Sequence, residues 1–265
     1  MTAATGIKII SMDESTQRRA DLTREAHGRN ITQNFFPAYK SIVEPLRYSA
    51  KDAKRRFGRE LSVGEIGCYT SHFKCWEWLA NSKEYDQAII MEDDIIIDWN
   101  VINALEKCRI SDYGINYLRL FTTHPVKWNI AKFRFLSAHY HLIRTTGTVF
   151  GTQGYMLTKA AATRLLNYRS VSSPVDWILA RYWEHGLGSY SLFPFPIIER
   201  HIPSSIGDQR HAVGTVGFAD KLHHLGWRIM DNAKMRVCNF SMVGHRPLGT
   251  TKDEGPPFIT GCVPE

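Results

Sequence analysis

Residues 87–91 form a short run rich in β-branched residues that ends directly in three acids, Glu92, Asp93 and Asp94. A run of this length and β-branched content predicts a central strand that is covered on both faces. In open α/β sheets, ligands bind in the crevice outside the carboxyl ends of the strands. The three acids are therefore expected at the edge of a binding crevice, and this feature constrains the fold more than any other.

The rest of the chain alternates between strand and helix patterns. Extended segments are expected at residues 7–12, 115–121, 148–157 and 192–198. Helices are expected at residues 17–27, 66–80, 158–166, 174–184 and 218–235. This alternation predicts an α/β fold with a mostly parallel central sheet.

Two of these helices have specific signals. Ile66, Tyr69, Phe73, Trp76 and Ala80 are spaced 3, 4, 3 and 4 residues apart, which places them on one helix face. The segment 172–174, Ser-Ser-Pro, predicts a helix start with serine at the cap and proline in the first turn.

Length and composition favour one large domain. The chain has 265 residues, of which 43% are hydrophobic and 22% charged, so it can bury a substantial core. The five cysteines are odd in number and form no C-x-x-C pair, which argues against a disulfide scaffold and favours a reducing compartment. The sequence shows neither a secretory signal nor an apolar stretch long enough for a membrane helix, so we expect a cytoplasmic location.

The net charge of +7 is unevenly distributed, with a basic segment at residues 47–59 that contains the single acid Asp52. Its basic residues are Arg47, Lys51, Lys54, Arg55, Arg56 and Arg59. A solvated helix face and a surface for anionic lipid headgroups both remain open as interpretations. No nucleic-acid motif accompanies the segment, so we expect no nucleic-acid partner.

The acidic triplet has the chemistry of a metal site. In an extended chain, residues two apart project to the same side, so Glu92 and Asp94 can share one site while Asp93 points away. Carboxylate oxygens suit a hard divalent cation that bridges protein and diphosphate. A solvated turn without a ligand, and the site of a metal-dependent phosphoesterase, are the alternatives that the triplet alone permits.

Five segments resemble blocks of glycosyltransferase family 25, in the same order. They are residues 9–19 (IISMDESTQRR), 62–76 (SVGEIGCYTSHFKCW), 88–97 (AIIMEDDIII), 151–166 (GTQGYMLTKAAATRLL) and 173–179 (SPVDWIL). The resemblance spans roughly residues 6–206, and the family includes bacterial lipo-oligosaccharide galactosyltransferases and animal collagen galactosyltransferases.

The resemblance implies a type A glycosyltransferase fold, with one Rossmann-like nucleotide-binding domain at residues 1–206. Residues 207–265 are then a helical C-terminal extension packed on the same domain. It also implies inversion at the anomeric carbon and the use of Mn²⁺ or Mg²⁺. Asp94 becomes the likeliest direct metal ligand, joined by Glu92, which also helps to hold the donor.

The family blocks also imply residues that bind the UDP-sugar donor. Arg18, which follows the first strand, is expected to pair with uracil or diphosphate through its fork of donors. The remaining expected donor-binding residues are Glu65, Ser71, His72, Asp93, Gln153, Gly154 and Tyr155. Glu65, Ser71 and His72 have a structural alternative, in which they only fix the turn and the helix start. A third metal ligand is expected from a late histidine, either His201 or His245.

Asp176 is the expected general base. An inverting transfer needs a carboxylate opposite the leaving UDP, to accept the proton of the acceptor hydroxyl group. The alternative is a first-turn aspartate that is favoured by the helix dipole alone.

Together with this resemblance, the sequence predicts β-galactosyl transfer from UDP-galactose to a lipopolysaccharide or lipo-oligosaccharide acceptor, presented at the inner face of a membrane. Two alternatives remain open. One is the same chemistry with UDP-glucose or a UDP-N-acetylhexosamine, and the other is a glycan-binding protein that has kept the fold without catalysis.

Overall fold

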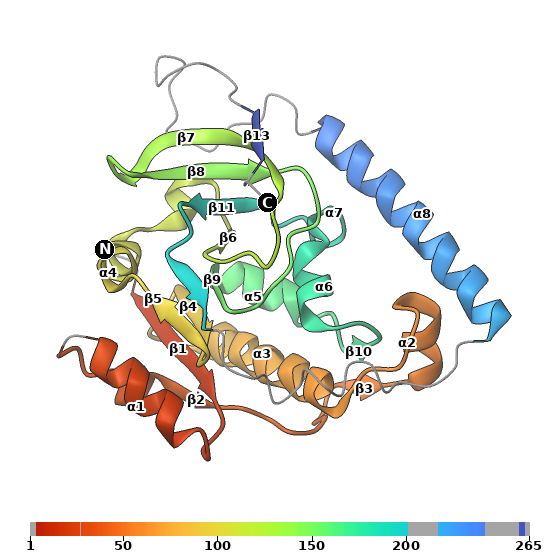
Figure 1. The fold of residues 1–265 in the computed structure, drawn as a ribbon, viewed down its shortest axis with the longest axis horizontal. Helices are drawn as coiled ribbons and strands as arrows, with labels where there is room; N and C mark the ends of the chain where they lie inside the picture. Colours follow the sequence, from red (N-terminus) through yellow and green to blue (C-terminus); the bar gives the residue numbers. More distant parts are fainter. Residues whose placement is uncertain (1–3, 27, 201–216, 242–259, 263–265) are drawn as a thin grey trace.

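The computed structural model describes residues 4–26, 28–200, 217–241 and 260–262 of the chain. Within them, one sheet has nine strands in the order β13-β7-β8-β11-β6-β9-β4-β1-β2 (Figure 1). In chain order these strands are β1 (Thr5–Ser11), β2 (Phe35–Pro37), β4 (Gln87–Glu92), β6 (Tyr117–Arg119), β7 (Lys127–Ser137), β8 (Tyr140–Thr145), β9 (Gly154–Thr158), β11 (Tyr190–Phe193) and β13 (Thr260–Cys262). Two small pairs join β3 (Arg47–Tyr48) to β10 (Ser170–Val171), and β5 (Ile95–Ile97) to β12 (Ile197–Glu199).

The sheet is mixed. Six strands, β1, β2, β4, β6, β7 and β11, run in one direction, whereas β8, β9 and β13 run in the other. The expected parallel arrangement is found in β2-β1-β4. It is interrupted where β9 lies antiparallel between β4 and β6. The apolar pattern of a buried strand does not encode its direction, so this insertion was not predictable from periodicity.

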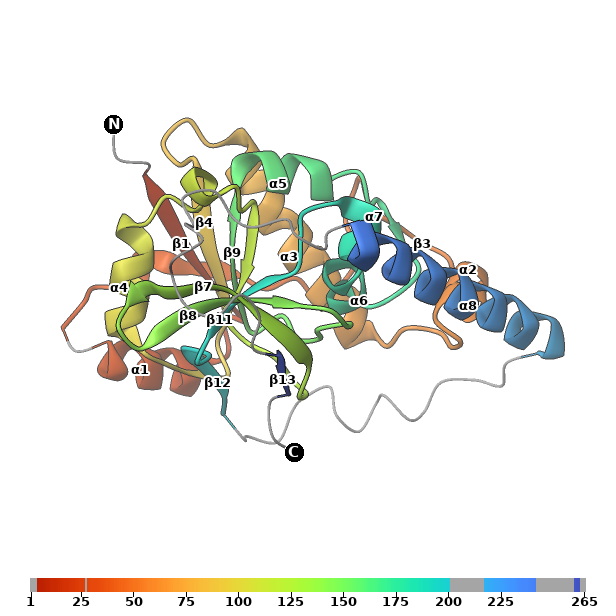
Figure 2. The ribbon, with the colours of Figure 1, turned by 90° about the horizontal axis from the view of Figure 1, so that it is seen from above.

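Helices cover both faces of the sheet (Figure 2). They are α1 (Thr16–Glu25), α2 (Ala50–Arg56), α3 (Val63–Asn81), α4 (Trp99–Lys107), α5 (Lys159–Leu165), α6 (Val175–Ala180), α7 (Tyr182–His185) and α8 (Phe218–Ser241). A hydrophobic core lies on each side of the sheet. Successive side chains of β4 point to opposite faces of the sheet, so this strand contributes to both cores. Ile89 and Met91 pack with α1 and α4, whereas Ala88 and Ile90 pack with α3 and α5. Strand β4 is therefore buried on both sides, as the sequence predicted.

Helix α3 begins with a capping box. The Ser62 hydroxyl accepts a hydrogen bond from the Glu65 backbone N–H at 3.2 Å, and the Glu65 carboxylate accepts one from the Ser62 N–H at 2.9 Å. Arg59 also donates two hydrogen bonds to the Glu65 carboxylate, at 2.6 and 2.8 Å. The apolar face predicted from the 3–4 spacing is confirmed, since Tyr69, Phe73 and Trp76 are buried.

Gly67 lets the preceding loop lie directly on α3. The Ser71 hydroxyl donates to the Gly67 carbonyl oxygen at 2.7 Å and accepts from the Tyr39 N–H at 2.8 Å. A Cβ atom at position 67 would lie 2.4 Å from the Tyr39 carbonyl oxygen. The loop carries Tyr39 and Lys40, which reappear in the functional site below.

We expect Gly67→Ala to lower the free energy of unfolding by about 1–3 kcal/mol, because backbone must move to admit the methyl group. The gain of roughly 1 kcal/mol in helix propensity offsets only part of this cost. Gly147→Ala is the matched control, since nothing lies within 4 Å of its Cβ position. Urea unfolding of both variants measures the difference. Equal unfolding free energies would show that the loop does not depend on the small residue.

The helix predicted for residues 174–184 is interrupted. Pro174 occupies the cap position of α6 without a side-chain hydrogen bond, and Arg181 (φ −90°, ψ 58°) separates α6 from α7. The buried Arg181 guanidinium forms ion pairs with Glu184 and with Asp231 of α8. This buried charge is paired with acids from two elements, which the local pattern did not reveal. Gly186 (φ 64°) ends α7 as expected.

Helix α8 lies along α2 and α7 through its polar face (Figure 1). Arg55 pairs with Asp220 at 3.3 Å, and the Arg56 guanidinium lies 4.6 Å from the Trp227 ring. The Tyr182 hydroxyl donates to the Asn239 side chain at 2.8 Å. The opposite face of α8 exposes seven large apolar residues. They are Phe218, Leu222, Leu225, Ile229, Met230, Val237 and Phe240.

Candidate functional site

The acidic triplet lies where the ends of β1 and β4 meet the start of β9. Strands β1 and β4 are parallel, with Ile10 opposite Glu92, so Ser11 lies next to the first acids. The antiparallel β9 begins at this same edge, and the Glu92 N–H donates to the Gln153 carbonyl oxygen at 3.1 Å. The predicted position of the triplet at a strand-end crevice is therefore confirmed.

Asp93 is fixed by its neighbours. Its two carboxylate oxygens accept hydrogen bonds from the Ser11 hydroxyl at 2.7 Å and from Arg18 at 3.0 Å. Arg18 also lies 4.0 Å from the Asp94 carboxylate, so its positive charge interacts with both carboxylates. Asp93 is thereby held on the Arg18 side of the site.

The Asp94 carboxylate has the burial and the charge environment of a metal ligand. Its Oδ1 atom is buried and has no hydrogen-bond partner among the described residues. Burial, together with the charge of Glu92, raises the pKa of Asp94 from 3.8 to about 7, against the lowering effect of Arg18. The Asp94 carbonyl oxygen accepts a 2.7 Å hydrogen bond from the Arg200 N–H, which fixes the backbone.

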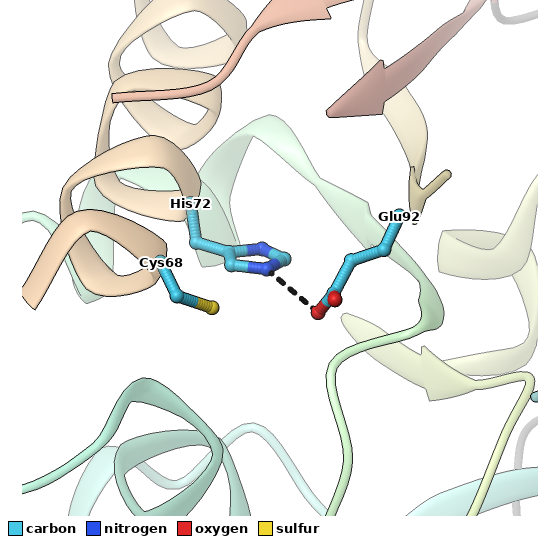
Figure 3. Close-up of side chains that lie close together, drawn as sticks. All are labelled: Cys68, His72 and Glu92. Atoms are coloured by element: carbon cyan, nitrogen blue, oxygen red, sulfur yellow. Dashed lines mark hydrogen bonds and ion pairs between the residues drawn. The ribbon is translucent and has the colours of Figure 1, made fainter. Parts of the chain in front are cut away.

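Glu92 ends a hydrogen-bonded chain that reaches into the core, and Figure 3 shows the first contact of this chain, between Glu92 and His72. Its Oε1 atom accepts a hydrogen bond from the Thr152 hydroxyl and lies 3.4 Å from His72 Nε2. His72 Nδ1 lies 2.8 Å from the Tyr155 hydroxyl, which accepts a hydrogen bond from Trp76 Nε1 at 2.9 Å. Because the indole only donates, the Tyr155 oxygen is the acceptor of that bond, whereas the direction of the bond between Tyr155 and His72 Nδ1 depends on the tautomer of His72.

The raised pKa of Asp94 makes stability depend on pH. The folded state binds this proton more tightly than the unfolded state, whose aspartate has its usual pKa. The contribution of Asp94 to stability is thus fully present below pH about 4 and is lost as pH rises through about 7.

We therefore expect Asp94→Asn, which carries no charge at any pH, to be more stable than wild type at about pH 8, on the order of 2 kcal/mol. The difference should shrink as the pH falls to about 5. Thermal unfolding at several pH values, without divalent cations, measures it. A difference that stays constant with pH would contradict the burial of this charge.

Two cavities meet at the triplet. The first cavity, about 310 Å³, lies on the side of β1 and of the loop before α3. Its lining residues are Ile10, Ser11, Met12, Arg18, Ala38, Tyr39, Lys40, Val63, Gly64, Cys68, Ser71, His72, Glu92, Asp93 and Asp94. The second cavity, about 480 Å³, lies toward α6 and shares only Cys68, Glu92 and Asp94 with the first. Both volumes are in the range of small-molecule sites, about 300–1,000 Å³.

The second cavity contains Asp176. The Asp176 carboxylate accepts a hydrogen bond from the Trp177 N–H at 2.8 Å, and burial raises the pKa of Asp176. The Trp177 ring packs against Phe57 and Phe150, with centroid distances of 5.3 and 5.4 Å. The cavity therefore presents an aromatic wall and a half-buried carboxyl group on the far side of Glu92 and Asp94.

The structure brings most of the predicted site residues together. Arg18, Ser71, His72, Glu92, Asp93 and Asp94 line the first cavity, and Glu65, Gln153 and Asp176 line the second. Glu65 and Ser71 also have the structural roles that were left open, in the cap and in the loop contact. Gly154 and Tyr155 line neither cavity; Tyr155 is buried behind His72. His201 and His245 lie outside the described residues.

Sequence reasoning missed several residues of this site, among them four beside the acids. Cys68 borders both cavities, Thr152 binds Glu92, Ser11 binds Asp93, and Glu199 reaches the second cavity because β12 pairs with β5. The positions of Ser11 at a strand end and of Cys68 four residues before His72 were visible signals. Glu199 had none, because it is more than a hundred residues from the triplet in sequence.

The sequence of this chain matches one known protein family across the site. The model of glycosyltransferase family 25 (LPS biosynthesis protein) matches residues 4–179, and thus includes all three acids and Asp176. The chain belongs to glycosyltransferase family 25. The resemblance found in the sequence motifs is thereby confirmed.

Relatives come from bacteria and animals. The chain is 28% identical over 205 residues to the lipooligosaccharide biosynthesis protein lex-1 of Haemophilus influenzae, covering 65% of this chain and 66% of that protein. It is 23% identical to a glycosyltransferase 25 family member of Anopheles gambiae, over 64% of this chain and 30% of that protein. A Bos taurus relative, "Probable inactive glycosyltransferase 25 family member 3", is 25% identical over 54% of this chain and 27% of its own length. The chain therefore spans between about a quarter and two thirds of these relatives.

Proposed function

We propose that this chain transfers galactose from UDP-galactose to a lipopolysaccharide or lipo-oligosaccharide glycan, with inversion at the anomeric carbon. The observation that carries the proposal is the meeting of two cavities at Glu92 and Asp94, with Asp176 in the second of them. Donor and acceptor of a group transfer must approach one another from two sides, and this arrangement provides two sides. We also propose the type A fold, with a catalytic unit at residues 1–206 and an extension at 207–265 packed on it.

The first cavity suits the nucleotide. Tyr39, Ile10 and Val63 supply apolar surface for a base and ribose, and Arg18 and Lys40 supply positive charge for the diphosphate. Asp93 orients Arg18 through its 3.0 Å hydrogen bond and prevents it from pairing with Asp94 alone. In this arrangement the galactosyl group lies over Glu92 and Asp94, between the two cavities.

The acids fit a divalent cation such as Mn²⁺ or Mg²⁺. The buried Oδ1 atom of Asp94 has no partner among the described residues, and Glu92 adds a second carboxylate beside it. Asp94 and Glu92 would hold the ion, which, when bound, neutralises the charge that develops on the leaving diphosphate. Arg18 supplies a further fixed positive charge on the same side.

Asp176 acts on the acceptor. The acceptor hydroxyl oxygen forms a bond to the anomeric carbon as the bond from that carbon to the UDP oxygen breaks, and Asp176 takes the hydroxyl proton. The raised pKa of Asp176 strengthens it as a base. The wall formed by Trp177, Phe57 and Phe150 offers an apolar surface for the face of an acceptor sugar.

The test is release of UDP from a panel of UDP-sugars, with and without Mn²⁺ and acceptor glycan. We expect Mn²⁺-dependent release that is fastest with UDP-galactose and is coupled to product formation. Faster release from UDP-glucose or a UDP-N-acetylhexosamine would show that the donor is a different UDP-sugar, while the proposed transfer reaction would stand. UDP release without glycosylated product would favour hydrolysis of the phosphoester type. Binding of glycan without UDP affinity would identify a non-catalytic member of the family.

Contact with a membrane is the second part of the proposal. Four residues of the basic segment form ion pairs with acids, Lys54 with Glu60, Arg55 with Asp220, Arg56 with Glu184 and Arg59 with Glu65. The segment is therefore largely neutralised, and α8 is the better candidate. No helix in the described ranges has the length and hydrophobicity needed to cross a membrane.

Exposed basic residues accompany the apolar face of α8, which is defined by its seven exposed apolar residues. These are Lys221, Arg228, Lys234 and Arg236. Apolar side chains flanked by basic ones match an interfacial helix that rests on anionic lipid headgroups. The polar face of the helix is used for contacts with the protein, which leaves the apolar face outward.

We expect Ile229→Glu to reduce binding to vesicles that contain an anionic phospholipid by about 10-fold or more, because it puts a charge into the apolar face. Ile198→Glu is the matched control, since Ile198 and Ile229 are both 62% exposed and only Ile229 lies on α8. Cosedimentation with vesicles measures the binding. Equal binding of the two variants, or a dimer that is lost in Ile229→Glu, would assign the face to something other than lipid.

A further inference from the structure

Three potential metal ligands of different chemistry converge between the two cavities (Figure 3). Cys68 and His72 are four residues apart on α3 and so lie on one helix face, and Glu92 faces them from the end of β4. One ligand atom from each residue lies within 4.8 Å of the other two. This set of a sulfur, a nitrogen and an oxygen differs from the all-oxygen pair of Glu92 and Asp94.

The distances suit a tetrahedral ion. Zn²⁺ binds imidazole nitrogen and carboxylate oxygen at about 2.0–2.1 Å, which places two such ligands about 3.3 Å apart. His72 Nε2 and Glu92 Oε1 are 3.4 Å apart without any rearrangement. The Cys68 sulfur lies within 4.8 Å of both other ligand atoms, against roughly 3.5 Å in a tetrahedral site, so it must move closer by no more than about 1.3 Å.

The support around His72 is that of a metal ligand. Its second ring nitrogen already has a partner, the Tyr155 hydroxyl at 2.8 Å, and the Tyr155 hydroxyl is held in turn by Trp76. Such a partner fixes the ring orientation of a ligating histidine. With an ion on Nε2, the ring proton of His72 lies on Nδ1 and is donated to the Tyr155 oxygen, while the thiol proton of Cys68 is released to solvent.

The fourth position of the site is open. Cys68 and Glu92 line both cavities, so an ion held by the three residues faces the space between them. Three protein ligands and one open position are the arrangement of zinc sites that accept a water or a substrate oxygen. A thiolate and an imidazole select Zn²⁺ or Co²⁺ over Mn²⁺ or Mg²⁺, which prefer oxygen.

We infer that Cys68, His72 and Glu92 form a binding site for a thiophilic divalent ion, Zn²⁺ or Co²⁺, distinct from the oxygen site at Asp94. The two sites share Glu92, so an ion in one site competes for this carboxylate with an ion in the other. Zn²⁺ thus opposes activity that depends on Mn²⁺, and it does so through a ligand set that Mn²⁺ does not use. The binding itself is independent of the donor, the acceptor and the reaction proposed above.

Titration of the full chain with Co²⁺, followed by absorption, tests the site. We expect a near-ultraviolet band of sulfur-to-cobalt charge transfer that Zn²⁺ abolishes by competition. The band should be lost in Cys68→Ser and kept in Cys108→Ser, a matched control whose thiol lies at the end of α4. Tyr155→Phe should weaken Co²⁺ binding about 10- to 100-fold, the effect of losing a partner that orients a ligand.

A second measurement keeps the inference testable if Cys68→Ser does not fold. Alkylation of Cys68 in the wild-type chain, followed by mass spectrometry, should slow markedly with Zn²⁺ and not with Mg²⁺. No charge-transfer band in wild type, a band that survives in folded Cys68→Ser, or alkylation indifferent to Zn²⁺ would each overturn the site. These readouts do not involve glycosyl transfer, so a failed transferase assay leaves them unaffected.

Discussion

Asp94→Ala is expected to reduce Mn²⁺-dependent transfer from UDP-galactose by about 10²- to 10³-fold, the size of effect seen when one preorganised electrostatic group is removed. The buried Oδ1 atom of Asp94 has no other partner among the described residues, so its loss removes a ligand position and leaves protein hydrogen bonds intact. Initial rates of UDP release over a range of Mn²⁺ concentrations measure the effect.

Asp112→Ala is the matched control for this prediction. Asp112 is an acid whose side chain is 66% exposed, in the short 3₁₀ helix Ile110–Tyr113, and it lines neither cavity. Its removal should leave the rate unchanged. Full activity of Asp94→Ala would exclude the oxygen site. Weak activity that high Mn²⁺ restores would mean that Glu92 and other groups suffice to hold the ion.

Asp176→Asn is expected to lower kcat by about 10²- to 10⁴-fold, the usual contribution of a general base. The affinity for UDP should not change, because Asp176 lines only the second cavity. Asparagine keeps a side-chain oxygen for the Trp177 N–H, so the start of α6 is preserved. A UDP titration by calorimetry, beside the transfer assay, separates binding from turnover.

The pH dependence gives Asp176 a second readout. The base must be ionised, so wild-type kcat should rise with pH through the raised pKa of Asp176 and then level off. In Asp176→Asn this rise should disappear along with most of the rate. Unchanged turnover in the variant, or an unchanged pH profile, would assign the proton transfer to another group.

Local patterns predicted the elements around the site well. The 3–4 spacing on α3 and the apolar run of β4 placed the SVGEIGC block and the acids correctly, because each pattern reports burial within one element. Thr158 was also predicted as a cap, and it accepts a hydrogen bond from the Ala161 N–H. These features depend on residues that are close in sequence.

Features that depend on distant residues were missed. The hairpin β7–β8 is only partly buried and contains register shifts, so its residues do not alternate cleanly. Glu199 reaches the site because β12 pairs with β5, and no local pattern encodes that pairing. Periodicity predicted helix 218–235 but not that its polar face would meet the protein, since ion pairs with Arg55 and Arg181 decide its orientation.

The junction between the two cavities has a consequence for inhibition. Because only Cys68, Glu92 and Asp94 separate the nucleotide side from the Asp176 side, one molecule can occupy both. A bisubstrate compound that joins a uridine diphosphate mimic to an acceptor sugar would place its second half at a high effective concentration once the first has bound. Such a compound should inhibit more strongly than an equimolar mixture of its halves, and a linker that avoids the two carboxylates would preserve this gain.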